Sequence, residues 1–306
     1  MSELRLVFLG TGSGRPTPKR NVAALYVQYE GTAVLFDCGE GTQMQLLHAG
    51  VKSSRLDAIC ITHFHGDHIN GLPGFIGTMG LNGHTTPITL VGPRGMDRYL
   101  RTLADLLICR PSFPIKIVEN EPAVVYQTKA FTIEACKLHH RIPTHGFLFR
   151  EHDHPGRFDL ATAKALGVPA GPLFGRLQRG ETVTLDDGTE VTPGQVLGET
   201  RSGRSFAYIS DTRPSPSVVD FVQGVDVLVH EATYLHEFAD QARDRGHSTA
   251  REAAQVAERA GVGRLILTHI SPKHHSKREI LSEAREIFPN TELASDLASF
   301  ELPIPA

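Results

Sequence analysis

Three histidines and an aspartate occupy six consecutive positions within the segment ICITHFHGDHING, residues 59–71. His63, His65, Asp67 and His68 follow an apolar run typical of a β-strand, so we expect them where that strand ends. Imidazole nitrogens and carboxylate oxygens are donors that zinc prefers, and manganese and iron also accept them. A solvated polar loop is the alternative, but it does not explain four such side chains at one strand end. The spacing predicts one half of a two-metal site.

Three further candidate ligands follow other apolar runs. His140 comes directly after FTIEACKLH, Asp211 after SFAYIS, and His269 after RLILT. Strand ends are rigid supports and suit a preorganised site. The Asp211 carboxylate can bridge two cations, and two cations about 3.5–4 Å apart activate water for hydrolysis of a phosphodiester. Each residue alone also fits a structural role, whereas the seven together complete two coordination shells.

The elements that must position these residues are short strands in the first half of the chain and alternating strands and helices near its end. Ser248 is expected to cap the helix of residues 248–261, and Gly261 to end it. The predicted strands lie in 4–10, 22–37 (a hairpin about Glu30 and Gly31), 55–62, 87–93, 123–151 (a meander), SFAYISD, VDVLVHEAT and RLILTHI. Two other helices are predicted, in 95–107 and in SKREILSEAREIF. Two predicted strands end in similar sequences, ICITH and LILTH. This similarity is expected if the two halves of the fold arose by duplication.

The composition changes between about residues 152 and 203, where glycine, proline and turn residues are dense and large apolar residues are sparse. Such a segment contributes little to a core, so it is expected to be an insertion or a protruding arm. Lys164, Arg176 and Arg179 form a basic stretch on it, with no acid between 164 and 180.

Composition limits the classes of function. The net charge of −3 predicts no general affinity for polyanions, so binding of nucleic acid would need local patches such as Arg15, Lys19 and Arg20. Four scattered cysteines without a CxxC pair predict reduced thiols. No apolar run approaches the ~18 residues of a membrane span, and no secretory signal is apparent, so a cytoplasmic protein without a membrane partner is expected.

Residues 63–68, HFHGDH, are similar to the signature of the metallo-β-lactamase superfamily. The blocks FLGTGSGRPTPKRNVA, FDCGEGTQ, LHHRIPTHGF, AYISDT, VLVHEAT, GHST and LILTHIS resemble, in order, those of ribonuclease Z in its short form. LGVPAGPLFGRLQRG, residues 166–180, resembles the glycine-proline motif of that family's flexible tRNA-binding arm. The match covers nearly the whole chain, and the arm motif with HEAT and HST points to this branch of the superfamily.

The resemblance implies an α/β fold: an αβ/βα four-layer sandwich of the metallo-β-lactamase type, formed by a single domain of residues 1–306 with the arm inserted at about 152–203. It implies two Zn²⁺ per subunit, with Mn²⁺ or Fe²⁺ as alternatives. The implied ligands are His63, His65 and His140 for one ion, Asp67, His68 and His269 for the other, and Asp211 as the bridge.

The implied activity is that of an endoribonuclease that cuts the 3′ trailer from precursor tRNA just after the discriminator nucleotide. A hydroxide bridging the two ions attacks, and the cut leaves a 3′-hydroxyl on the tRNA and a 5′-phosphate on the trailer. Asp67 is the implied proton acceptor and His247 the proton donor to the leaving oxygen, a role that histidine suits near neutral pH. Glu231 orients His247 or forms a structural pair with it.

The resemblance also implies a homodimer, with RNA contacts at Lys19, Arg20, Gly171, Pro172 and Lys273. The chain departs from the family at Pro272-Lys273-His274-His275, where an arginine-tyrosine pair is common. A lysine keeps the charge there but loses bidentate phosphate geometry. His139 stands where an acid is common, and His140 aligns as the ligand.

Two other functions fit parts of this pattern. One is a different phosphodiesterase or small-molecule hydrolase of the same superfamily, against which the arm motif argues. The other is a metal-free RNA-binding subunit, against which seven competent ligand positions argue.

Overall fold

A computed structural model describes residues 3–273 and 276–303. These residues divide into two compact units, which are described separately: residues 3–150 with 205–303, and residues 151–204. His274 and His275, part of the departure from the family pattern, lie outside the described residues.

Two seven-stranded sheets form the centre of the first unit. The spatial order of the first is β16 (Ser299–Leu302), β1 (Leu4–Gly10), β2 (Ala24–Tyr29), β3 (Thr32–Phe36), β4 (Leu56–Cys60), β5 (Ile88–Gly92) and β6 (Ile115–Glu119). The order of the second is β15 (Thr291–Leu293), β14 (Arg264–Thr268), β13 (Val227–Glu231), β12 (Ser205–Ile209), β9 (Thr144–Glu151), β8 (Phe131–Leu138) and β7 (Val124–Gln127). Strands β3 to β6 are parallel, as are β12 to β15, so the carboxyl ends of each set meet at one edge of the sheet.

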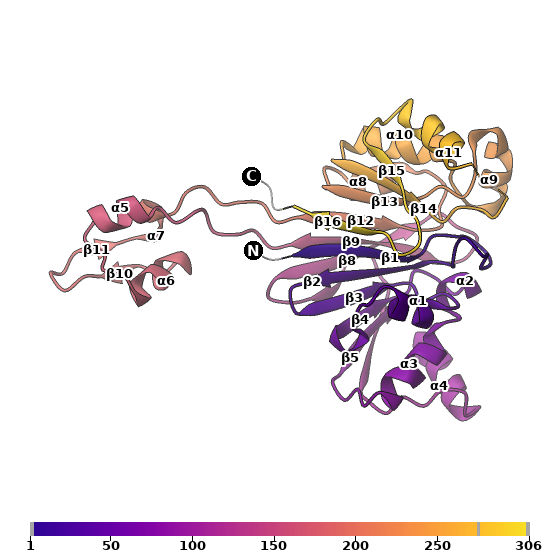
Figure 1. The fold of residues 1–306 in the computed structure, drawn as a ribbon, viewed down its shortest axis with the longest axis horizontal. Coiled ribbons are helices and arrows are strands. Elements are labelled where there is room, and N and C mark those ends of the chain that lie inside the picture. Colours follow the sequence, from indigo (N-terminus) through magenta and orange to yellow (C-terminus); the bar gives the residue numbers. More distant parts are fainter. Residues whose placement is uncertain (1–2, 274–275, 304–306) are drawn as a thin grey trace. The chain divides into compact units, whose positions relative to one another are not determined.

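Helices cover the outer face of both sheets (Figure 1). The first sheet packs against α1 (Thr42–His48), α3 (Leu72–Leu81) and α4 (Met96–Asp105), and the second against α8 (Pro216–Phe221), α10 (Ala250–Ala260) and α11 (Lys277–Arg285). The other helical segments of this unit are η1 (Ser53–Arg55), α2 (Gly66–Ile69), η2 (His236–Phe238) and α9 (Ala239–Arg245). The four-layer αβ/βα sandwich is therefore confirmed. Within residues 3–273 and 276–303, no helix combines the length and the hydropathy that a membrane crossing requires.

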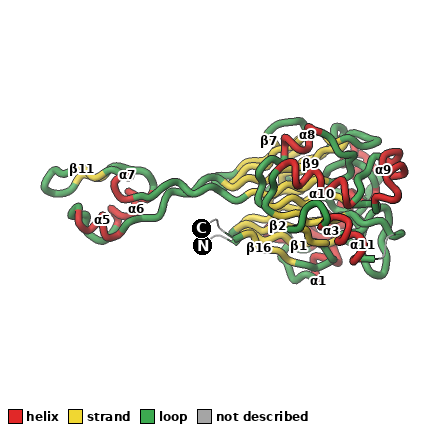
Figure 2. The backbone as a smooth tube through the Cα atoms, turned by 90° about the horizontal axis from the view of Figure 1, so that it is seen from above, coloured by secondary structure: helices red, strands yellow, loops and turns green. Residues whose placement is uncertain are grey.

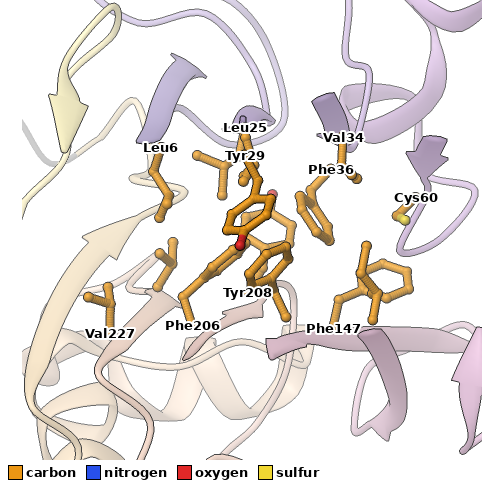
Figure 3. Packing of buried hydrophobic residues seen from close by; sticks show 14 of the residues in the cluster. Leu6, Leu25, Tyr29, Val34, Phe36, Cys60, Phe147, Phe206, Tyr208 and Val227 are labelled. Atoms are coloured by element: carbon orange, nitrogen blue, oxygen red, sulfur yellow. The ribbon is translucent and has the colours of Figure 1, made fainter. Parts of the chain in front are cut away.

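The main core lies between the two sheets and is made of apolar side chains from both (Figure 3). Successive residues of a strand point to opposite faces, so Leu6 of β1 joins this core while Val7 packs under the helices. Phe36 of β3 meets Phe206 of β12 edge to face, with ring centroids 5.7 Å apart. Because both faces of each sheet are covered, the central strands are mostly apolar, with exceptions such as Asp57 of β4 and Glu231 of β13.

The strands and helices predicted from the sequence are confirmed, apart from shifts of one to three residues at their ends. The predicted cap at Ser248 is wrong. Thr249 caps α10 and forms a capping box with Glu252, whereas the Ser248 hydroxyl donates to the Thr212 carbonyl at 2.7 Å. Gly261 ends this helix in the left-handed region at φ 62°, as predicted. The tertiary contact of Ser248 decides between two adjacent hydroxyl residues, and local sequence does not reveal it.

The second unit, residues 151–204, folds around a small apolar core of its own. Its short helices are drawn in red in Figure 2. Its elements are α5 (Leu160–Ala165), α6 (Pro172–Gln178), α7 (Pro193–Val196) and the hairpin of β10 (Val183–Thr184) and β11 (Glu190–Val191). The buried apolar residues of its core are Ala163, Val168, Leu177, Val183, Val191 and Val196. At its base the buried Arg204 guanidinium donates to Glu151 twice, from Nε to Oε2 at 2.7 Å and from Nη2 to Oε1 at 3.0 Å. The composition of this segment predicted little contribution to a core, and the core it forms is small.

Candidate metal centre

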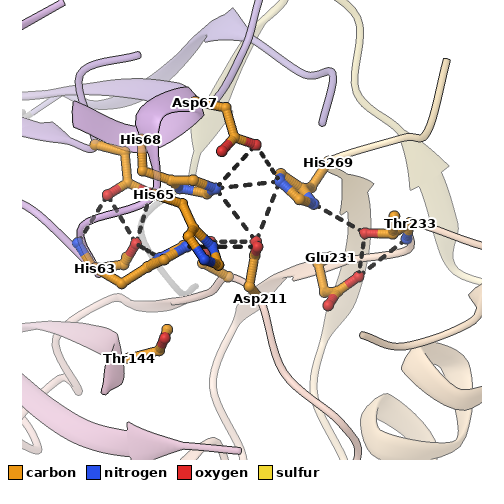
Figure 4. Close-up of polar contacts among 12 residues, drawn as sticks. His63, His65, Asp67, His68, Thr144, Asp211, Glu231, Thr233 and His269 are labelled. Atoms are coloured by element: carbon orange, nitrogen blue, oxygen red, sulfur yellow. Dashed lines mark hydrogen bonds and ion pairs between the residues drawn. The ribbon is translucent and has the colours of Figure 1, made fainter. Parts of the chain in front are cut away.

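The seven predicted ligands come together at one edge of the first unit. Figure 4 shows His63, His65, Asp67, His68, Asp211 and His269. His63 follows β4, and the chain then turns at His65 into the short helix α2, which carries Asp67 and His68. His140, Asp211 and His269 follow β8, β12 and β14. His269 adopts a left-handed φ of 57°, a conformation uncommon for a residue with a side chain.

One group of donor atoms consists of three imidazole nitrogens and one carboxylate oxygen. His65 Nδ1 lies 3.0 Å from His63 Nε2 and 3.2 Å from His140 Nε2. Asp211 Oδ2 lies 3.6 Å from His63 Nε2 and 3.7 Å from His140 Nε2. His139, the neighbour of His140, is exposed and outside the group.

The second group faces the other oxygen of the same carboxylate. Asp211 Oδ1 lies 3.4 Å from His68 Nε2 and 3.2 Å from His269 Nε2, and these two nitrogens are 3.2 Å apart. Asp67 Oδ2 lies 3.5 Å from His68 Nε2 and 3.4 Å from His269 Nε2. Asp211 therefore presents one oxygen to each group, which is the arrangement that a bridging carboxylate requires.

The outward nitrogens of four histidines are held by acceptors, which fixes the tautomers. The Gly246 carbonyl can only accept, so His140 Nδ1 donates to it at 2.7 Å. His68 Nδ1 donates in the same way to the Asp37 carboxylate at 2.8 Å. With a proton on the outward nitrogen, the inward Nε2 atom of His140 carries a lone pair, and that of His68 does so when the ring is neutral.

The tautomers of His63 and His269 are fixed in a similar way, but through a threonine hydroxyl that lies between the ring and a carboxylate. The Thr62 hydroxyl donates to Asp37 at 2.9 Å, so it accepts from His63 Nδ1, also at 2.9 Å. The Thr233 hydroxyl donates to Glu231 at 2.5 Å and accepts from His269 Nδ1 at 2.9 Å. Fixed outer hydrogen bonds of this kind are typical of histidines that bind a metal.

These donor sets fit metal ions. Bare nitrogen lone pairs about 3 Å apart repel one another unless a cation lies between them. Nitrogen and oxygen ligands about 2 Å from a zinc ion at tetrahedral angles lie roughly 3.4 Å apart. The separations of 3.0–3.7 Å within the two groups bracket that value. The cluster is therefore a group of side chains able to bind metal ions.

The pKa shifts agree with this conclusion. Burial lowers the pKa of His63 well below its usual value, and burial also lowers the pKa values of His65 and His140, so these rings are neutral as ligands must be. Burial opposes the charge of His68 too, but three carboxylates, with Asp211 the strongest, raise its pKa. The same negative field favours a cation at the centre.

His247 lies beside the cluster and is paired with a buried acid. Its Nδ1 is 2.9 Å from Glu231 Oε1 and 3.9 Å from Asp211 Oδ2, and 14% of its side chain is exposed. Burial disfavours the imidazolium, but the charges of Glu231 and Asp211 outweigh burial and raise the pKa of His247 to about 9. Glu231 Oε1 also accepts from the Thr212 backbone N–H at 2.9 Å, so the acid is held on two sides.

A cleft of about 400 Å³ opens over the cluster, and its rim is basic. Arg15 and Lys273 line it, as do two arginines that the sequence analysis did not single out, Arg141 and Arg245. The Gly14 backbone N–H donates to Asp67 Oδ2 at 2.6 Å, which ties the loop of residues 11–23 to the cluster.

The other predicted RNA contacts lie elsewhere. Lys19 is exposed and lines a separate cavity with Arg20, whose guanidinium donates to Thr11 Oγ1 at 2.5 Å and to the Ala294 carbonyl at 2.9 Å. Arg20 is thus engaged within the fold. Gly171 and Pro172 are exposed at the start of α6 in the second unit.

The basic stretch of the second unit is partly neutralised. Glu181 Oε2 lies 2.9 Å from Arg176 Nε, and Glu181 Oε1 lies 3.2 Å from Arg179 Nε. The acid comes just after the interval of residues 164–180 that contains no acid.

Sequence reasoning missed Asp37, the acid that supports two of the histidines. It is fully buried, has a left-handed φ of 57°, and accepts from Thr62, His68 and the Tyr208 hydroxyl. The signal was available, because Asp37 ends the apolar run AVLF just as Asp211 ends SFAYIS.

The fold and the converging histidines and aspartates define a protein of the β-lactamase superfamily, whose domain model matches residues 32–270. The comparisons with single proteins are more specific. Ribonuclease Z of Gloeothece citriformis (strain PCC 7424) is 45% identical over 307 residues, which cover 98% of this chain and 96% of that protein. Ribonuclease Z of Brevibacillus brevis is 44% identical over 306 residues, with 97% and 96% covered.

The crystal structure of human tRNase Z, short form, matches with a TM-score of 0.71 and 26% identity, over 99% of this chain and all of that one. The chain therefore belongs to the ribonuclease Z family, and it is a hydrolase.

Proposed function

We propose that the chain is a zinc-dependent endoribonuclease that removes 3′ trailers from precursor tRNA. The cut falls just after the discriminator nucleotide and leaves a 3′-hydroxyl on the tRNA and a 5′-phosphate on the trailer. One observation carries the proposal: two donor groups share Asp211, one oxygen each, in a chain about 45% identical to proteins named ribonuclease Z.

Two Zn²⁺ are proposed, with Mn²⁺ or Fe²⁺ as alternatives. One ion would be held by His63, His65 and His140. The other ion would be held by Asp67, His68 and His269, and Asp211 would bind both ions. When bound, such ions stabilise the charge on a phosphoryl group and lower the pKa of water.

Asp67 is the proposed proton acceptor. Its Oδ2 atom is engaged by His68, His269 and the Gly14 N–H. Among the described residues Oδ1 has no hydrogen-bond partner, so it is the oxygen left to take a proton from the attacking water.

His247 is the proposed donor of a proton to the leaving 3′ oxygen. Glu231 holds His247 Nδ1 at 2.9 Å, and the ring lines the cleft over the donor cluster, so the Nε2–H is left for the substrate. The P–O3′ bond breaks, the oxygen takes the proton of His247, and the phosphate stays on the trailer. We therefore assign Glu231 a positioning role.

The RNA is proposed to be held at several places. Lys273 on the rim of the cleft and Lys19 and Arg20 on the adjoining loop would contact the strand, and Gly171 and Pro172 would contact the tRNA body. Residues 152–203 would form the arm of a single domain spanning 1–306. An arm that recognises shape suits structured RNA.

A homodimer in the cytoplasm is also proposed. In support, α1, α3 and α4 carry large apolar side chains that are exposed: Met44 and Leu47 on α1, Leu81 at the end of α3, and Leu106, Leu107 and Ile108 after α4. Exposed apolar groups of this size favour a protein interface.

The test is to map the cut on a 3′-extended tRNA transcript with and without a chelator. We expect one cut after the discriminator nucleotide, its loss with chelator and its return with zinc. A chain that hydrolyses bis(p-nitrophenyl) phosphate but leaves the transcript whole would instead be a small-molecule phosphodiesterase.

A further inference from the structure

His247 separates the metal cleft from a second cavity of about 410 Å³. Among the described residues it is the only one that lines both. None of the seven candidate ligands lines the second cavity, whose wall includes His139, Arg213, Arg243 and Glu252. The second cavity therefore adjoins the proposed proton donor.

Backbone hydrogen bonds tie this wall to the metal centre. The Arg213 N–H donates to the His139 carbonyl at 2.9 Å, and the His139 N–H donates to Thr212 Oγ1 at 3.0 Å. Arg213 is two residues from Asp211, and His139 is next to His140. The position of the cavity relative to the metal ligands is therefore fixed by short stretches of chain.

The cavity favours an anion. Arg213 has no ion-pair partner in the part of the chain that the structure describes. The Arg243 guanidinium pairs with Asp240 at 2.8 Å, and both side chains are exposed enough for this ion pair to be weak. The one acid of the wall, Glu252, accepts from the Thr249 N–H through Oε2. Guanidinium groups bind phosphate oxygens through paired N–H donors.

We propose that Arg213 and Arg243 bind the phosphate on the 5′ side of the nucleotide whose 3′ oxygen is the leaving group. This inference rests on the proposed function. The 3′ oxygen must reach His247 from the metal side. The 5′ phosphate of the same nucleotide lies at the opposite end of its ribose and extends past His247 into the cavity. The two arginines would fix the position of the cut by holding this phosphate.

The test combines a protein change with a change in the RNA. Arg213→Ala is compared with Arg213→Lys and with the control Arg259→Ala, which removes an exposed arginine from the last turn of α10. Each is assayed on a 3′-extended tRNA and on the same RNA with a neutral methylphosphonate at the 5′ phosphate of the discriminator nucleotide. Zinc content, thermal melting and hydrolysis of bis(p-nitrophenyl) phosphate are measured in parallel.

We expect Arg213→Ala to lower kcat/KM on the tRNA about 10- to 100-fold, with partial recovery in Arg213→Lys and no change in Arg259→Ala. The methylphosphonate should cost the unchanged chain a similar factor and cost Arg213→Ala a clearly smaller one, because the Arg213 contact is already lost and only the Arg243 contact remains. Hydrolysis of the small substrate should not change. A methylphosphonate that costs Arg213→Ala as much as the unchanged chain, or costs neither, would overturn the inference. Failure of the unchanged chain to cut the tRNA at all would instead refute the proposed function.

Discussion

Replacing Asp37 by asparagine tests whether the hydrogen bonds behind the histidines sustain metal binding. Asp37 is fully buried, and its carboxylate accepts from the Thr62 N–H at 2.8 Å, the Thr62 hydroxyl at 2.9 Å, His68 Nδ1 at 2.8 Å and the Tyr208 hydroxyl at 3.1 Å. An asparagine keeps the shape but removes the charge and turns one acceptor into a donor. At least one of these donors then loses its partner.

The magnitude follows from these contacts. A hydrogen bond to a charged group contributes roughly 1.5–3 kcal/mol. Loss of a partner behind a metal ligand typically lowers metal affinity about 10- to 100-fold, or roughly 1.4–2.8 kcal/mol. Asp37 contacts His68 directly but reaches His63 only through Thr62. We therefore expect the ion of the Asp67–His68–His269 group to weaken most.

The assay is zinc content by mass spectrometry after dialysis over a range of buffered free zinc. We expect one of two zinc equivalents in Asp37→Asn to need 10- to 100-fold more free zinc, and the other to shift less. The matched control is Asp57→Asn on β4, where the carboxylate accepts from the Ala33 N–H at 3.2 Å. Coinciding zinc curves for Asp37→Asn and the unchanged chain would refute the reasoning.

Three further predictions concern the proton donor, the second unit and its base. His247→Asn should lower kcat on precursor tRNA about 10²- to 10⁴-fold with unchanged zinc content; loss of zinc would show that the residue supports the metals instead. Deletion of residues 153–200 should abolish cleavage of precursor tRNA and spare hydrolysis of bis(p-nitrophenyl) phosphate, whereas equal loss of both activities would refute the arm's role. Arg204→Met breaks the buried pair with Glu151 at a cost of about 3 kcal/mol, so amide exchange of Glu151 should accelerate roughly 100-fold; unchanged exchange would show that the pair does not hold the base of the unit.

The sequence was sufficient for features set by local pattern. Apolar runs ending in glycine or a polar residue predicted the strands from Leu4–Gly10 to Arg264–Thr268, and Gly261 predicted the end of α10. The rule that candidate ligands follow strand ends selected Asp211 and His269, which the structure brings within 3.2 Å of each other. Their role as metal ligands is still a proposal.

Features set by tertiary contact could not be predicted in this way. Thr249 caps α10 because Ser248 is bonded to Thr212, far along the chain. The hydrogen bonds of the Arg20 guanidinium to Thr11 and to the Ala294 carbonyl are another such feature, and the contact of Arg20 with RNA is still a proposal. Such outcomes depend on which segments meet in space, and the local pattern of a single sequence does not reveal them.

The most direct test of the account is the location of the metal in a crystal of the zinc-loaded protein, by anomalous scattering at the zinc edge. The account predicts two peaks in each chain, one among His63, His65 and His140 and one among Asp67, His68 and His269, with the Asp211 carboxylate in contact with both. A single peak away from Asp211, or two peaks bound by other side chains, would contradict it.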